Sequence, residues 1–458
     1  MSRPDAPTPT ASSASVLRRP VLWAAVAIAA VAALATALSY LGGFLNPDGN
    51  ARDLPIALVD GDAGARFAGS RVDLGADVVA QIRAPNPALG RRVRWIVLPD
   101  RAAALSRIRA DRAYAAIVVP PDFSARLVAI GTSAVAGRAE RPARLEVLTS
   151  PAAGSFAGTY ASTVARAAVD QVSRASSDRL AGLLAPTGAR LTPAAAQVVG
   201  RPVEEAVTVA QPLPPKAGRG LAPFYFAVML TLAGVIAANI VHAVVDLLAG
   251  HSEIEVWGRT VRGPDLGWTA TRRWHAKLLV GAVTAVASGA AVTWAAVGLI
   301  GMGTTTSALA VGAFAVLGVA AVEAIALALL GALGLAGSLA SVFVTTILGV
   351  PSAGGVYPLE ATPAAFRFLA GWMPLRYLTD GARALIFFGQ ERPRLGAAVL
   401  TTSLWLAAAT VAGTLVAHRL DRRDRLQRRH EVRLDRIAAS PLPSDGGTPA
   451  LAGATASR

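Results

Sequence analysis

Four polar side chains interrupt long apolar stretches of this sequence and could handle a proton or a polar group there. Asn239, His242 and Asp246 follow one another at i, i+3 and i+7, so they share one face of a helix. Because a histidine changes its charge near neutral pH, the aspartate one turn away makes a proton relay a candidate role. Glu323 lies alone near the middle of a later apolar stretch. A structural hydrogen bond or, for Asp246, a position near water is the alternative interpretation.

Burying such groups in lipid is costly, and this cost restricts where they can face. On insertion scales, an ionisable side chain costs at least ~2.5–3.5 kcal/mol at the centre of a membrane helix. We therefore expect all four side chains to face the interior of a helix bundle, a wet cavity or one another.

The apolar stretches themselves are long enough to cross a lipid bilayer, which takes about 20 apolar residues in a helix. The block at 308–350 would be ~65 Å long as a single helix, about twice the membrane thickness. We expect it to turn back at its small residues Gly331, Gly334, Gly337 and Ser338. The sequence therefore predicts an α-helical polytopic membrane protein with six transmembrane helices, one plus five, at 21–45, 221–249, 278–300, 308–331, 334–350 and 396–417.

The positive charges predict the orientation of these spans. The net charge is +15, and basic residues gather just before the first span, in the loop 250–277 and in the tail 418–458. Short basic flanks stay cytoplasmic, so both termini are expected inside and no nucleic acid partner is needed to explain the charge. A cleavable signal peptide is the alternative for 21–45, although signal cores usually hold only about 7–15 residues. Residues 1–20 and the end of the tail have the composition of disordered segments.

Between 46 and 220 the sequence changes to a mixed α/β pattern. Strands are predicted at 54–59, 93–98, 114–119 and 145–148, a short helix at 101–110, and one or two amphipathic helices over 152–184. The proline-rich run 212–215 then leads back to the membrane as a stiff connector. The sequence therefore predicts an extracytoplasmic α/β domain inserted after the first span.

Motifs of several enzyme classes are missing from the sequence. It has no cysteine, and its five histidines lack the spacing of zinc ligands. Its two lysines, Lys216 and Lys277, follow proline and alanine, so neither can end a phosphate-binding Gly-Lys-Ser/Thr loop. A Gly-x-Ser-x-Gly nucleophile motif is also missing. We expect no enzyme, no metal and no cofactor, and any energised work would draw on a partner subunit or an ion gradient.

Four strings in the sequence resemble one family of membrane proteins. They are LPIALVDGDAGA (54–65), RAYAAIVVPPDFSARL (112–127), LAPFYFAVMLTLAG (221–234) and PSAGGVYPLEATPAAFRFLAGWMPLRYLTDGARALIFFG (351–389). In this order they resemble the YhgE/Pip-like (phage infection protein) relatives of ABC type-2 transporter permeases. The resemblance implies a six-span permease-like subunit in the plasma membrane of a bacterium, acting as a homodimer.

The resemblance also implies a contact with a cytoplasmic ATPase. In type-2 permeases a nucleotide-binding subunit grips the loop between the second and third spans, which here is 250–277. Its candidate contacts are Glu253, Glu255, Arg259 and Arg262. This loop is rich in arginine and tryptophan and could instead lie on the membrane surface, so the ATPase partner stays an open alternative.

The segment 351–389 is too interrupted by proline and glycine to span the membrane. A short re-entrant or interfacial helical pair fits its apolar stretches, because broken backbone at membrane depth must be shielded by protein or line a cavity. The resemblance implies a position near the outer exit of a translocation path, and an outer cap on the bundle is the alternative. Its candidate residues are Pro351, Ser352, Gly354, Gly355, Tyr357, Pro358 and Pro374.

Transport is the leading functional hypothesis. The chain would be a permease-like subunit of an ABC type-2 exporter that moves an amphiphilic, lipid-linked or drug-like substrate outward. The alternative is a non-transporting cell-envelope scaffold, or a receptor that outside agents such as phage exploit. A membrane enzyme is the least favoured class.

Overall fold

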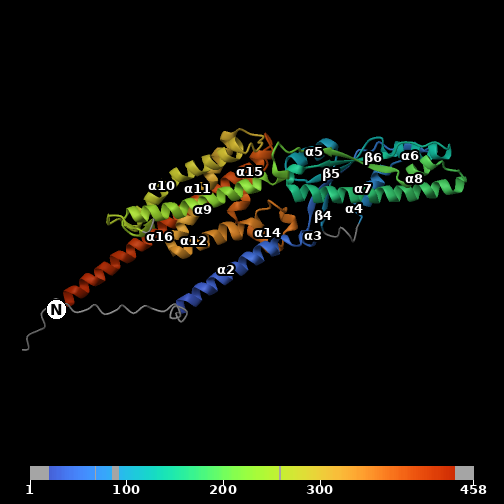
Figure 1. Cartoon of the computed structure of the whole chain (residues 1–458). Coiled ribbons are helices and arrows are strands. Elements are labelled where there is room, and N and C mark those ends of the chain that lie inside the picture. Colours follow the sequence, from blue (N-terminus) through green and yellow to red (C-terminus); the bar gives the residue numbers. More distant parts are fainter. Residues whose placement is uncertain (1–19, 68, 85–91, 257–258, 439–458) are drawn as a thin grey trace, which may run out of the picture.

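The structure is a computed structural model that describes residues 20–67, 69–84, 92–256 and 259–438. It has two parts, a bundle of long helices and an α/β lobe (residues 51–217) that extends from one end of the bundle (Figure 1). The predicted N-terminal tail before residue 20 and the last part of the basic tail, from residue 439, lie outside the described residues.

Five helical segments among the described residues are long and apolar enough to cross a membrane. They are α9 (Ala222–Leu248), α10 with its continuation (Ala270–Leu299), α11 (Ala308–Leu333), the α12–α13 segment (Leu335–Ser352) and the apolar part of α16 (Leu395–Gln427). These helices make the chain a membrane-embedded protein. The span predicted at 278–300 begins earlier, at Ala270, and α16 continues past 417 as far as Ala438.

The prediction that 308–350 folds back on itself is confirmed. α11 ends at Leu333, and Gly334 makes the turn with a backbone φ of +61°, which residues other than glycine rarely adopt. Three residues later, a Cβ at Gly337 would collide with the carbonyl oxygen of Leu329. The small residues are therefore needed for a turn this tight between α11 and α12 (Leu335–Val342).

α11 is the central helix of the bundle and has the largest buried share of the five apolar segments. It packs against α9, α10 and α16. Glycines let the neighbouring backbones approach it closely: a Cβ at Gly234 would lie 2.8 Å from Val322, and one at Gly289 would lie 2.7 Å from the backbone nitrogen of Val316. Packing through small residues is the usual way in which helices associate in lipid, where no hydrophobic effect drives them together.

A further helix, α2 (Pro20–Phe44), precedes the lobe and diverges from the bundle in Figure 1. Its described apolar stretch is Ala30–Phe44. Contacts of its described side chains hold its C-terminal part: the Ser39 hydroxyl donates a 2.7 Å hydrogen bond to the carbonyl of Ile347, and the rings of Phe44 and Tyr357 lie 5.6 Å apart. Four large apolar residues of α2, Val31, Leu34, Leu38 and Leu41, are exposed, as expected of a helix that faces lipid or a partner.

The lobe is built on a five-stranded sheet in the order β4-β1-β5-β6-β7. Its strands are β1 (Leu54–Asp60), β4 (Val93–Leu98), β5 (Ala115–Val119), β6 (Ala143–Thr149) and β7 (Val203–Val209). β4, β1 and β5 run parallel, β6 is antiparallel to β5, and β7 is parallel to β6. Strands lie at all four predicted positions. β7 was not predicted, because the glutamates Glu204 and Glu205 interrupt its apolar pattern at the edge of the sheet.

Helices cover both faces of the sheet. α5 (Arg101–Arg109) packs on one face, where Ile108 lies among Ala57, Val59 and Val118. The opposite face carries α4 (Leu74–Arg83), α6 (Phe123–Val135) and the single 30-residue helix α7 (Ser155–Leu184). α8 (Pro193–Gly200) lies against α6 and α7. The predicted "one or two" helices over 152–184 are thus mainly one long helix, which runs away from the bundle (Figure 1).

Candidate functional site

The predicted polar residues of the bundle separate into three groups, each completed by a residue from another helix. The first joins His242 and Asp246 of α9 to Lys277 of α10. The Lys277 ammonium lies 2.8 Å from one oxygen of Asp246 and donates a 2.9 Å hydrogen bond to the other. The Lys277 ammonium also lies 3.0 Å from Nδ1 of His242. The other ring nitrogen of His242, Nε2, lies 3.3 Å from Asp246. A neutral imidazole with its proton on Nε2 satisfies both of these contacts.

This group has an excess of positive charge. Arg273, one turn before Lys277, lies 3.9 Å from Asp246, and its Nε is buried without a hydrogen-bond partner among the described residues. Two cations therefore face one carboxylate beside a cavity of about 160 Å³, which Trp274, Gly331 and Gly413 also line. The arrangement suits an anionic group, because a net positive charge in a partly dry cavity attracts one more strongly than it would in water.

Glu323 forms the second group, deep in the bundle. The hydroxyl of Thr284 on α10 donates a 2.7 Å hydrogen bond to one carboxyl oxygen, and the other has no hydrogen-bond partner among the described residues. Glu323 is only 1% exposed, and a Cβ at Gly281 would lie 3.2 Å from its carboxyl group. Thr284 also lines an apolar groove of about 330 Å³ between α9 and α10. Its side chain therefore contacts both the Glu323 carboxyl group and this groove.

Asn239 forms the third group and does not join His242 and Asp246. Its amide donates a 2.8 Å hydrogen bond to the carbonyl of Val235, and its oxygen accepts one of 2.8 Å from Ser338 of α12. The first bond lies within α9, and the second joins α9 to α12. The shared helix face correctly predicted that His242 lies beside Asp246. Asn239 on the same helix instead binds a residue of the neighbouring helix α12.

The predicted outer segment is where the bundle, α2 and the lobe meet. Pro351 and Ser352 end α13 (Gly349–Ser352), and Pro374 begins α15 (Pro374–Phe387), a mostly buried helix that packs against α9 and α16. Between them, Gly355 packs on the ring of Phe224, and Arg383 donates a 3.0 Å hydrogen bond to the carbonyl of Gly354.

Tyr357 and Pro358 continue this junction. The ring of Tyr357 lies 4.6 Å from Phe156 at the start of α7 and contacts Phe44 of α2. Pro358 precedes the turn Leu359–Ala361, and α14 (Ala364–Ala370) follows with Phe368 and Trp372 exposed. The segment thus contains two short helices. α15 is buried in the bundle, and α14 has apolar residues at the surface.

Ion pairs that the sequence does not reveal connect this junction to the lobe. Asp111, 3% exposed, lies 3.8 Å from Arg383 and 3.3 Å from Arg394, which also donates a hydrogen bond to the Asp111 carbonyl. Burial raises the pKa of the Asp111 carboxyl, and the two guanidinium groups oppose that shift. Burial likewise raises the pKa of Tyr114 well above its usual value, so its phenol stays neutral and donates to Glu360 at 3.1 Å.

The predicted coupling loop is shorter than 250–277. It contains a hairpin of β8 (Glu253–Val256) and β9 (Arg259–Arg262), with Glu253 and Arg262 in an exposed ion pair of 3.1 Å. The side chains of Glu255 and Arg259 lie outside the described residues. α10 begins at Ala270, whose backbone amide donates to Asp421 of α16, so Lys277 belongs to a helix and not to the loop.

Comparison with known proteins identifies no relative: no protein-family model and no curated protein matches the chain. The resemblance to YhgE/Pip-like permeases therefore stays a prediction. Among the described residues, no group of three histidine, aspartate or glutamate side chains could hold a metal ion.

Proposed function

We propose that the chain is a permease-like exporter subunit that moves an amphiphilic, lipid-linked or drug-like substrate outward across a bacterial plasma membrane. The observation that carries the proposal is Glu323, a buried carboxyl group. Among the described residues, one of its oxygens has no hydrogen-bond partner, and Thr284, which binds the other, also lines an apolar groove. An ionisable group at this depth is costly and is usually retained in membrane proteins for a substrate or proton path. The apolar groove would take the apolar part of a substrate.

The group around Lys277 supplies a second part of this path. It lies toward the end of α9 remote from the lobe, and its excess positive charge suits an anionic headgroup. Seven residues of α10 separate Lys277 from Thr284, which corresponds to about 10 Å along the helix. A substrate with a charged head and an apolar tail could therefore contact both places at once.

In the proposed orientation the lobe is extracytoplasmic and both termini are cytoplasmic, with α2 as the sixth span. At 25 residues α2 is about 38 Å long, enough for the hydrocarbon layer. The start of α2 and the arginine-rich end of α16 point away from the lobe in Figure 1, which agrees with basic flanks on the cytoplasmic side.

Reporter fusions test this orientation. We expect a reporter inserted at Gly137 in the lobe and one at Gly263 after the β8–β9 hairpin to report opposite sides of the membrane. Gly137 lies in the turn after α6 and Gly263 in the irregular segment after β9, so neither insertion interrupts a helix or a strand. Reports from the same side would contradict the proposed topology.

The proposed partners are the lipid bilayer, a second copy of the chain and a cytoplasmic ATPase that contacts the β8–β9 hairpin. The hairpin supports the last contact, because it projects from the end of α9 remote from the lobe, where a cytoplasmic subunit could reach it (Figure 1). The exposed apolar face of α2 leaves room for a second copy.

Replacing Glu323 by glutamine tests the export function directly. Glutamine keeps the size of the side chain and can still accept the hydrogen bond from Thr284, but it removes the ionisable group. We expect at least a tenfold lower rate of efflux of fluorescent anionic amphiphiles from cells, with an unchanged amount of folded protein. Glu140→Gln, at an exposed position in the lobe, is the matched control. Equal efflux in the two variants would remove Glu323 from the path.

The alternative function, a cell-envelope scaffold or receptor, is favoured by the buried ion pairs that fasten the lobe to the bundle. A rigid junction of this kind suits a protein that presents its lobe. Efflux that is the same in cells with and without the chain would favour this alternative over export.

A further inference from the structure

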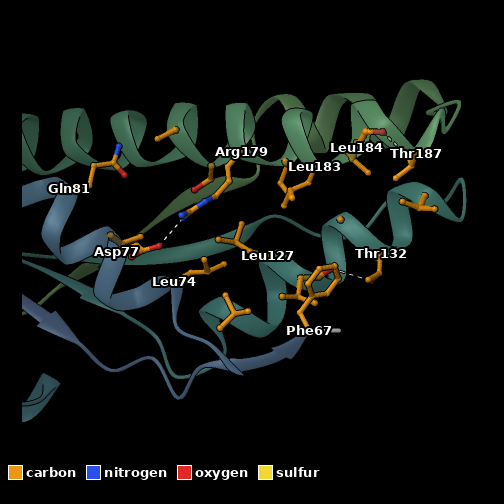
Figure 2. A pocket seen from close by; sticks show the side chains of 18 residues that line it. Phe67, Leu74, Asp77, Gln81, Leu127, Thr132, Arg179, Leu183, Leu184 and Thr187 are labelled. Atoms are coloured by element: carbon orange, nitrogen blue, oxygen red, sulfur yellow. Dashed lines mark hydrogen bonds and ion pairs between the residues drawn. The ribbon is translucent and has the colours of Figure 1, made fainter. Parts of the chain in front are cut away.

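The lobe contains an apolar cavity that the proposed export path does not use. Its volume is about 530 Å³, within the range usual for ligand sites. Figure 2 shows it between α7 on one side and α4, α6 and the β2–β3 hairpin (Ala65–Phe67, Ser70–Val72) on the other. Its wall is mainly aliphatic and includes Val72, Leu74, Val78, Leu127, Val128 and Leu180.

The cavity extends along α7. The wall that α7 provides runs from Ala175 to Leu184, a rise of about 14 Å. The wall has a single aromatic residue, Phe67, so it offers little to a flat ligand that binds by stacking.

Large apolar side chains remain exposed around the cavity. Phe67, Val135 and Leu183 are 45%, 51% and 60% exposed. All three line the cavity, so an occupant would remove them from water together. Clustered exposed apolar residues of this kind usually mark a binding site.

Polar groups are few, and the charged pair lies on the α4 side of the cavity. Arg179 and Asp77 form an ion pair of 2.8 Å and neutralise each other. The Thr132 hydroxyl donates to backbone carbonyls of its own helix. The Gln81 side chain, near this ion pair in Figure 2, also lines the cavity. Its carboxamide can bind a polar head, while the neutral ion pair adds no net charge.

We propose that this cavity binds the aliphatic chain of a single-chain amphiphile. A lipid that stays in the bilayer would not reach it, because Ala175 lies about 30 Å along α7 from its start at the junction with the bundle. The occupant is therefore an amphiphile that has left the membrane. This site does not depend on the export function.

Photolabelling of the full-length protein in detergent-free lipid nanodiscs tests the proposal. The probe is hexadecanoic acid with a photoactivatable diazirine near the end of its chain. After irradiation, we expect adducts on peptides from α6 and from the second half of α7. Unlabelled hexadecanoic acid in excess should compete with the probe for these adducts.

Two neighbouring residues provide matched variants. Ser176 lines the cavity and Ser177 does not, so Ser176→Phe should lower lobe labelling at least tenfold and Ser177→Phe should leave it unchanged. If Ser176→Phe fails to fold, Gly131→Val fills the same space, since a Cβ at Gly131 would lie 3.4 Å from Leu180.

Three outcomes would overturn the proposal: adducts confined to the bundle helices, adducts that unlabelled hexadecanoic acid does not reduce, or equal lobe labelling in Ser176→Phe and Ser177→Phe. Because the readout is an adduct in the lobe, it is separate from efflux. Absence of lobe adducts in the unsubstituted chain, when that chain still exports, would reject this site alone.

Discussion

Replacing Asp246 by asparagine is expected to destabilise the helix bundle by about 3–5 kcal/mol, the usual result of removing one partner from a buried ion pair. Asp246 and Lys277 have side chains only 13% and 8% exposed, and their charged atoms lie 2.8 Å apart. Without the carboxylate, the Lys277 ammonium would be left among apolar helices beside a second cation, Arg273. We expect the loss as a lower midpoint of thermal unfolding of the purified protein.

A double variant separates stability from function. Asp246→Leu combined with Lys277→Met replaces the pair by apolar side chains and should recover most of the stability, because no buried charge is left unpaired. The control is Asp178→Asn, at an exposed position on α7. A double variant that is stable but inactive in efflux would assign the group to the transport path. An Asp246→Asn protein as stable as the control would contradict the structural role.

Replacing Asp111 by asparagine is expected to loosen the lobe from the bundle. The carboxylate lies between Arg383 and Arg394, and removing it takes one ion-pair partner from each guanidinium group, although Arg394 keeps Asp380 at 3.8 Å. The expected cost is again about 3–5 kcal/mol, since Asp111 is buried. The effect should be concentrated at the junction, where Tyr114 and Glu360 also meet.

Hydrogen exchange measures this effect by region. In Asp111→Asn we expect faster exchange in residues 354–361 and in the neighbouring part of the lobe, with little change in α11. Asp122→Asn is the control, because it removes an exposed ion pair with Arg126 that should contribute less than about 1 kcal/mol. Uniformly faster exchange in every helix, or equal exchange in the two variants, would contradict a local role at the junction.

The sequence by itself predicted the features that depend on neighbouring residues. The apolar stretches predicted helices long enough for a membrane, because the cost of placing a segment in lipid adds up along the chain. The hairpin within 308–350 followed from the length of that block, and the place of its turn from its small residues. The four strands followed from short apolar runs ended by turn residues. Strand β7 was missed, since an edge strand with exposed glutamates lacks the apolar run that was used to identify the others.

Only the tertiary structure decided which polar groups meet. Lys277 looked like part of a basic loop, yet it lies inside α10 and pairs with Asp246, 31 residues away. The same holds for Thr284 beside Glu323, and for Asp111 beside Arg394, whose contact spans 283 residues. Hydrophobicity and charge can be counted along the chain, whereas an ion pair or a hydrogen bond depends on distances through space. Those distances are set by how the helices and the sheet pack against one another.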